Sequence, residues 1–177
     1  PSITMGWKHK EMYRNLIYLT KAEVEAISNL DLSDNPKLDR ARDIFLFGVY
    51  SCQRVSDYNN LNPSDIEEDN GEYYLHIHQR KTGTEVDVPL TEDAVKILRK
   101  YNMIPPRMTE QHLNKAIKEV AKKAGITTMV EQVSVKGGVE VKEQIEKYKL
   151  VCTHTARRTG ATLLYLDKWS MDEIALM

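Results

Sequence analysis

A period-two stretch in an otherwise helical chain limits the fold more than any other feature of this sequence. Apolar and polar side chains alternate over Tyr73–His78 and again over Glu85–Val88. Such alternation is typical of β-strands with one buried face. The intervening residues 80–84 contain a glycine and are typical of a turn. We therefore predict an antiparallel β-hairpin with Lys81 near its tip, and a third strand near Ile66.

Helical patterns flank this hairpin on both sides. Thr20 and Glu23 form a capping-box pattern, which predicts a helix through about Leu30. Three further helices are predicted, at 38–52, 92–101 and 109–124. A second hairpin is expected around Gly137 and Gly138, which valines flank. The predicted fold class is α+β, mostly helical, with a small antiparallel sheet and a second β-hairpin.

Composition and charge bear on DNA binding and on the cellular location of the chain. Its 177 residues are 41% hydrophobic and carry a net charge of −1, which is not typical of a strongly DNA-binding domain. Acidic runs such as residues 65–69 can nevertheless offset a basic face elsewhere. Cys52 and Cys152 do not resemble a disulfide framework, so a reducing cytoplasm is the predicted location. The start lacks an initiating Met and a signal-peptide core, and residues 1–18 are interpreted as a linker.

The segment from Cys152 to Thr162 indicates an anion-binding helix start. His154 and Arg157 are three residues apart, so on a helix they share one face. Thr153 is the predicted N-cap. The first turn of a helix offers free N–H groups and the positive end of the dipole to an anion. Leucines 163, 164 and 166 are expected to form the buried side of this helix.

Four segments, taken in order, resemble a known family. They are Arg54-Val55-Ser56-Asp57, Lys81 ahead of Val88-Pro89-Leu90, the stretch from His154 to Thr162, and an apolar segment that begins at Ile174. This order resembles the catalytic domain of tyrosine recombinases, the phage-integrase family, especially integrases of mobile elements. The resemblance covers Tyr18 to Met177. It implies a catalytic domain over 19–177, truncated or disordered at its C-terminus, that follows an absent N-terminal DNA-binding domain.

The resemblance implies a role for each of five residues. In the family a tyrosine attacks a DNA phosphodiester, which forms a 3′-phosphotyrosine and releases a 5′-hydroxyl. Arg54 and Arg157 would hold the scissile phosphate, because guanidinium groups donate paired hydrogen bonds and stay charged. Lys81 would protonate the leaving oxygen, and His154 would donate to the phosphate or manage the proton of the nucleophile. Asp57 would support Arg54.

The resemblance also implies partners and further contacts. The expected partners are double-stranded DNA, other copies in a synaptic tetramer, and accessory DNA-bending or directionality proteins, with no membrane. No metal or other cofactor is expected, because the phosphotyrosine bond stores the broken linkage. The DNA-contacting residues implied are Arg80, Thr82, Lys115 and Arg158.

Several positions depart from the family pattern. Residues 51–53 read Ser-Cys-Gln where the family usually has a glycine-containing turn. Arg158 stands where a histidine is more usual, and Gly160 where a bulky aromatic often follows. The resemblance places the nucleophilic tyrosine and a further His or Trp beyond Met177, so this fragment alone is expected to be inactive. Tyr165 is interpreted as a core residue and is not nominated as the nucleophile.

Three alternatives remain open from the sequence. The first is a recombinase-derived DNA-binding regulator that has lost catalysis. The second is a phosphodiesterase or topoisomerase relative that uses the same residues. The third concerns His76 and His78, which share one strand face and suit a transition metal, although a solvated or DNA-facing strand without metal is the preferred interpretation.

Overall fold

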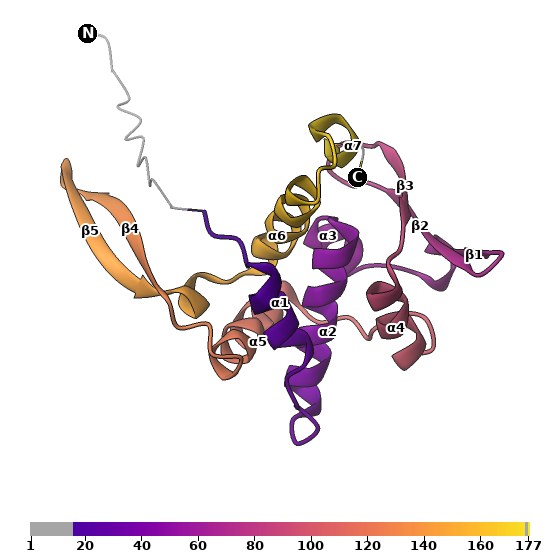
Figure 1. Cartoon of the computed structure of the whole chain (residues 1–177), viewed down its shortest axis with the longest axis horizontal. Coiled ribbons are helices and arrows are strands. Elements are labelled where there is room, and N and C mark those ends of the chain that lie inside the picture. Colours follow the sequence, from indigo (N-terminus) through magenta and orange to yellow (C-terminus); the bar gives the residue numbers. More distant parts are fainter. Residues whose placement is uncertain (1–15, 176) are drawn as a thin grey trace, which may run out of the picture.

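The central element of the fold is a long buried helix, α2, around which the other helices pack. The computed structural model describes residues 16–175 and 177. The helices are α1 (Lys21–Ser28), α2 (Pro36–Ser51), α3 (Val55–Tyr58), α4 (Glu92–Lys100), α5 (Glu110–Lys123), α6 (Thr153–Leu166) and α7 (Met171–Ala175), with short 3₁₀ turns η1 (Pro63–Asp65) and η2 (Lys147–Leu150). Helix α2 contacts α1, α3, α4, α5 and α6 (Figure 1). Phe45 and Phe47 on α2 are fully buried, as an apolar helix in the middle of a core requires.

Five strands form two separate antiparallel sheets. They are β1 (Ile66–Asp69), β2 (Glu72–His78), β3 (Glu85–Pro89), β4 (Met129–Lys136) and β5 (Val139–Glu146). The first three form a sheet in the order β1-β2-β3, and the last two form a hairpin. In the sheet, Leu75 pairs with both Ile66 and Val88, and these side chains are buried. The predicted hairpin, third strand and second hairpin are therefore confirmed.

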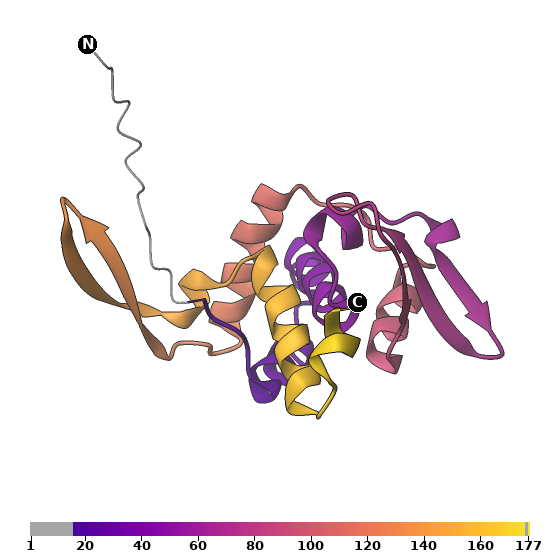
Figure 2. The same ribbon diagram turned by 90° about the horizontal axis from the view of Figure 1, so that it is seen from above.

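The sheets lie at opposite ends of the molecule. Figures 1 and 2 show the β4–β5 hairpin extending from one end and the three-stranded sheet at the other, with the helices between them. Helix α6 returns across α2 after the hairpin, and α7 follows it. No helix in the described part of the chain is long and apolar enough to cross a bilayer.

The helix boundaries follow from local capping. Thr20 and Glu23 form the predicted capping box at the start of α1. Thr91 and Thr109 accept backbone hydrogen bonds at the starts of α4 and α5. Gly125, with φ of +79°, follows the end of α5 in the left-handed conformation that glycine adopts without a steric penalty.

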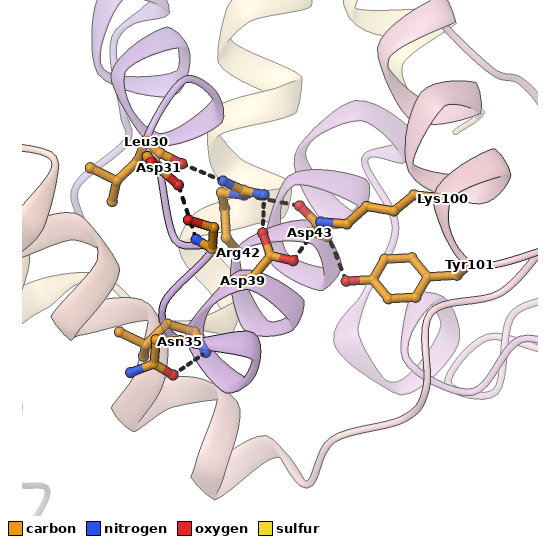
Figure 3. Close-up of polar contacts among 10 residues, drawn as sticks. Leu30, Asp31, Asn35, Asp39, Arg42, Asp43, Lys100 and Tyr101 are labelled. Carbon is orange, nitrogen blue, oxygen red and sulfur yellow. Dashed lines mark hydrogen bonds and ion pairs between the residues drawn. The ribbon is translucent and has the colours of Figure 1, made fainter.

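An ion cluster joins α2 to α4 (Figure 3). Asp43 is 4% exposed, and its two carboxylate oxygens accept from Arg42 Nε at 2.9 Å and from Lys100 Nζ at 2.6 Å. The Tyr101 hydroxyl also donates to Asp43, at 2.9 Å. Burial raises the pKa of Tyr101, and this hydrogen bond raises it further. Lys100 also pairs with Asp39, and Arg42 caps the Leu30 carbonyl at 2.6 Å. The cluster fixes the sheet-side helix α4 against the centre of the fold.

Three expectations about the ends of the fold need correction. The N-cap of α6 is Cys152, and Thr153 is its first helical residue. Tyr165 and Leu166 are 57% and 61% exposed, because the last turn of α6 runs past the elements that cover its start. Ile17 lies in the core, so the packed fold includes part of the expected linker at 1–18; residues 1–15 lie outside the described part.

Candidate active site

Arg54 lies at the sharp turn between α2 and α3. The helix ends at Ser51, and Cys52 reverses the chain with φ of 56°, a left-handed conformation. That conformation costs a non-glycine residue about 1–2 kcal/mol, which accounts for the glycine usual in the family. Gln53 is fully buried and anchors the turn through a hydrogen bond to the Ser51 carbonyl at 3.1 Å. Arg54 therefore emerges from a fixed, half-buried position as the N-cap residue of α3.

Arg157 lies close to Arg54 although a hundred residues separate them in sequence. It is half-buried on α6, and its Nη1 is buried without a hydrogen-bond partner within the described residues. Burial lowers the pKa of Arg157, the charge of Arg54 lowers it further, and Cys52 and Asp57 act in the opposite direction. Two guanidinium groups that repel each other and hold an unpaired N–H form a strong site for an anion.

Close packing of α6 on α2 brings these arginines together. A Cβ atom added to Gly160 would lie 2.1 Å from the Val49 carbonyl oxygen and 2.6 Å from Cys52 Sγ. Only glycine therefore permits this helix crossing, which explains why Gly160 replaces a bulky residue here. The Cys52 thiol is buried in the same contact, and burial raises its pKa to about 11. Cys52 and Cys152 are both free thiols, as predicted.

Lys81 lies in the exposed turn between β2 and β3. The backbone of Gln79 closes this turn, since its N–H donates to Thr84 O and its carbonyl accepts from Gly83 N, both at 2.8 Å. Gly83 has φ of +70°, as a tight turn of this kind requires. The Lys81 side chain is solvent-exposed at the tip. It is thus free to reach a ligand while its backbone is held.

Asp57 connects the turn of Lys81 to the arginines. Its carboxylate is buried, and Oδ1 accepts from the Arg80 backbone N–H at 3.3 Å. Its other oxygen, Oδ2, is buried without a hydrogen-bond partner in the described part of the chain. The charge of Asp57 acts on Arg157. The hydrogen bond of Asp57 thus goes to the Lys81 turn, and the orienting role expected for it at Arg54 stays a prediction.

His154 lies on the exposed side of the first turn of α6. That turn is fixed by Thr155, whose hydroxyl accepts from Cys152 N at 3.0 Å, and by Thr153, which donates to Glu110 Oε1 at 2.7 Å. His154 lines a hollow of about 430 Å³ together with Lys118, Lys149 and Arg158. The hollow therefore places positive charge beside the histidine.

The four residues expected at DNA occupy different environments. Arg80 and Lys115 are solvent-exposed, on the Lys81 turn and on α5. Thr82 donates its hydroxyl to Gln79 Oε1 at 3.0 Å. Arg158 is half-buried and donates to the Ile17 carbonyl at 2.8 Å, so it holds the start of the fold against α6.

Sequence reasoning missed Gln79, a buried residue at the centre of this site. Its Oε1 accepts from Arg54 Nη1 at 2.8 Å. The signal was available, because Gln79 continues the inward positions of Leu75 and Ile77 on the alternating strand. A polar residue at an inward strand position, next to a turn that carries a candidate site residue, therefore predicts a buried hydrogen bond near the site.

His76 on β2 contacts carboxylates on both neighbouring strands. His76 contacts Glu67 through Nε2 and Asp87 through Nδ1, each at 2.6 Å. Within residues 16–175 and 177, no group of three or more His, Cys, Asp or Glu side chains is arranged to hold a metal ion. The described structure thus gives the metal alternative no support.

Comparison with known proteins identifies one family by its sequence profile and a shared fold by solved structures. The sequence profile of the phage integrase family matches residues 17–177. No curated protein sequence shows significant similarity to the chain.

Similar solved structures include XerH site-specific recombinase bound to difH substrate, with a TM-score of 0.64 and 17% identity over 90% of this chain and 46% of that one. The catalytic core of lambda integrase gives 0.60 and 20% identity, covering 89% of this chain and 87% of that one. The Tn1549 transposon integrase in complex with circular intermediate DNA gives 0.57 and 12% identity, over 90% and 56%.

These structural matches establish the shared fold, and the chain spans about half the length of the XerH protein. The family profile covers nearly all of the described residues, including the segments that carry Arg54, Lys81, His154 and Arg157. The chain therefore belongs to the phage integrase family of tyrosine recombinases.

Proposed function

We propose that this chain is the catalytic domain of a site-specific DNA recombinase that cuts and rejoins strands through a 3′-phosphotyrosine. The observation that carries the proposal is the close packing of Gly160 against Cys52, which brings Arg157 near Arg54, together with the buried Nη1 of Arg157, which has no hydrogen-bond partner within the described residues. A phosphodiester satisfies both needs of this site, because it offers negative charge and several acceptor oxygens.

The two arginines act on the transition state. As the tyrosine oxygen approaches phosphorus and the 5′-oxygen departs, negative charge gathers on the non-bridging oxygens. Guanidinium groups held in advance at those oxygens stabilise this charge without reorganisation. The buried Asp57 carboxylate limits the mutual repulsion of the two cations.

Lys81 and His154 manage protons in the proposed reaction. The Lys81 ammonium gives a proton to the departing 5′-oxygen, and in the rejoining step the 5′-hydroxyl returns it while attacking phosphorus. His154 donates to the phosphate or receives the proton of the tyrosine. The exposed tip that carries Lys81 supports this role, since the side chain can enter a DNA groove.

The nucleophile in this proposal is a tyrosine that follows Met177 in the longer protein. Tyr165 is exposed on the last turn of α6, two turns beyond Arg157, and is not assigned that role. Double-stranded DNA is the proposed substrate, contacted by Arg80, Thr82, Lys115 and Arg158, and a synaptic tetramer is the proposed working assembly.

The test compares cleavage and binding in the full-length gene product. A nicked suicide substrate that contains the cognate site traps the covalent adduct, because the short fragment with the 5′-hydroxyl dissociates after cleavage and cannot rejoin. Arg54→Ala and Arg157→Ala are each expected to slow adduct formation by about 10²- to 10³-fold, with much smaller changes in DNA affinity. Arg99→Ala, which removes an exposed cation paired with Glu92, is the matched control and should cleave normally.

Two results would contradict the proposal. A folded full-length protein that binds its site and forms no adduct would favour the catalytically silent regulator. Relaxation of supercoiled plasmid without any specific site would favour a topoisomerase.

A further inference from the structure

We propose that Gln79 is a positioning residue that holds the turn of Lys81 in register with Arg54. The inference rests on the proposed function, because it assigns Gln79 the task of aligning the proton donor with the phosphate-binding arginine. Gln79 is 6% exposed and lies at the end of β2, two residues before Lys81.

All four hydrogen-bonding positions of the Gln79 side chain are used. Its Oε1 accepts from Arg54 Nη1 at 2.8 Å and from the Thr82 hydroxyl at 3.0 Å. Its Nε2 donates to Gln53 Oε1 and to the Met177 carbonyl, both at 3.3 Å. An amide offers two acceptor positions and two donor hydrogens, so this side chain is fully satisfied.

These contacts join the turn that carries the proposed acid to the arginine that would hold the phosphate. Thr82 flanks Lys81 in the turn, and the Gln79 backbone closes that turn at Gly83 and Thr84. Arg54 belongs to the α2–α3 junction. A single amide oxygen thus bridges the loop of the proposed acid and the arginine that would hold the phosphate. A displacement of either partner is transmitted to the other.

The amide nitrogen extends the link to the chain that follows α7. Gln53, next to Arg54, donates to the same Met177 carbonyl that accepts from Gln79. The two buried glutamines therefore tie the Arg54 turn, the Lys81 turn and the Met177 backbone into one network. Buried networks of this kind hold geometry tightly when every member is satisfied.

An aliphatic residue at position 79 would fill the space without these bonds. Arg54 and Thr82 would each lose an acceptor, and the Lys81 turn would keep only its backbone closure. A displacement of about 1 Å in a catalytic group can slow a reaction by about 100-fold. We expect the loss of rate to arise chiefly from poorer proton donation. Lys81 is exposed at the tip of its turn, so its position depends on Gln79 more than that of Arg54 does.

The test uses two suicide substrates that differ in one atom. One has the natural 5′-oxygen at the scissile bond, and the other has sulfur in its place. A thiolate leaves without a proton because its conjugate acid is far stronger than an alcohol, so the sulfur substrate does not need the acid. The full-length gene product is compared with Gln79→Leu, Lys81→Ala and Arg54→Ala by single-turnover cleavage, with DNA affinity and thermal unfolding measured in parallel.

The proposal predicts a distinct pattern. Gln79→Leu should cleave the oxygen substrate about 10- to 100-fold more slowly and regain most of that loss on the sulfur substrate, as Lys81→Ala does to a greater extent. Arg54→Ala should be slow on both substrates. Gln144→Leu, a substitution of the same kind on the exposed strand β5, should behave as the parent protein.

Gln79→Glu tests the same link if the leucine variant does not fold. It keeps both acceptor positions and loses the two donors, so Arg54 gains a charged partner that competes with phosphate. We expect slow cleavage of both substrates, as in Arg54→Ala.

Equal cleavage by Gln79→Leu and the parent protein, or an equal loss on both substrates in a folded Gln79→Leu variant, would overturn the positioning role while the proposed function stands. Cleavage by Gln79→Glu at the rate of the parent protein would overturn it as well. The absence of an adduct from the parent protein on both substrates would overturn the two proposals together.

Discussion

The close approach of α6 to α2 determines which residue types and backbone conformations are possible at two positions. Gly160 has no room for a side chain, and Cys52 accepts a left-handed backbone so that Arg54 can follow directly. Both features bring Arg54 close to Arg157. The departures from the usual family pattern at these positions are therefore parts of one packing solution.

Gly160→Ala should destabilise the fold and weaken the site. The added Cβ would overlap the Val49 carbonyl, which is backbone and cannot swing away. Such overpacking typically costs about 1–3 kcal/mol, and relief by a shift of α6 would carry Arg157 away from Arg54. The free energy of unfolding from urea titration measures the effect. Thr162→Ala on the same helix is the control, and equal stability of both variants would contradict the close crossing.

Individual elements are held in place by polar contacts as well as by the core. The cluster around Asp43 joins α2 to α4 (Figure 3). The contacts of His76 with Glu67 and Asp87 join the three strands of the sheet. The first set of contacts fixes α4 against the central helix, and the second holds the three strands of the sheet together.

Asp43→Ala should cost about 1–3 kcal/mol of stability. The Tyr101 hydroxyl would lose its acceptor, and Arg42 and Lys100 would each keep Asp39 but lose their second carboxylate partner. Denaturant unfolding provides the measurement. Asp93→Ala, which breaks an exposed pair with Lys96, is the matched control and should change stability by less than about 0.5 kcal/mol. Similar losses in the two variants would show that the cluster adds nothing beyond surface pairing.

His76 should make the stability of the sheet depend on pH. Its hydrogen bonds to Asp87 and Glu67 raise its pKa above the ordinary 6.5. The folded state therefore binds the proton more tightly, so the stabilisation is complete below the unfolded pKa and declines as pH rises through the higher folded value. Urea unfolding across this range should show the decline in the parent protein and lose it in His76→Gln.

His78→Gln, at an exposed position on the same strand, is the control for this experiment. An NMR titration of the His76 ring at or below pH 6.5 would refute the assignment.

Local sequence patterns predicted most helices and strands. The features that they did not predict depend on tertiary packing. Alternation at 73–78 and 85–88 and the cap at Thr20 depend on neighbours in sequence, so both hairpins and the first helix were predicted correctly. The prediction of buried residues at the end of α6 was wrong, because Tyr165 and Leu166 match an apolar pattern but are left exposed by the described part of the chain.

The candidate site needed information beyond local pattern. Arg54 and Arg157 were paired only through the family resemblance, since no local rule brings such distant residues together. Gln79 was missed although the strand register placed it inward. The contact of Asp57 with the Arg80 amide depends on how the sheet docks on α3, which sequence alone does not specify.

The whole molecule has two different β structures at its ends and the helices between them (Figures 1 and 2). The sheet carries the Lys81 turn at one end, and the β4–β5 hairpin extends from the other (Figures 1 and 2). With a net charge of −1, the proposed DNA binding requires local basic surfaces rather than overall charge. Lys115 is solvent-exposed on α5 and is one of the residues proposed to contact DNA.

Lys115→Ala should lower DNA affinity in a salt-dependent manner. Removing one phosphate contact reduces the slope of log affinity against log salt by about 1. Titration of a short duplex over a salt series measures this slope. Lys96→Ala, which removes a lysine already paired with Asp93 on α4, should leave the slope unchanged. Equal slopes in the parent protein and both variants would remove Lys115 from the DNA surface.

The most direct test of the proposed chemistry is to identify the protein atom joined to DNA. The full-length gene product would be trapped on the suicide substrate, digested with protease and nuclease, and analysed by mass spectrometry. We predict a nucleotide attached through its 3′-phosphate to a tyrosine that follows Met177, with the yield strongly reduced in Arg157→Ala. Attachment through another residue type or through the 5′-phosphate, or no attachment in a protein that binds its site, would contradict the phosphotyrosine mechanism.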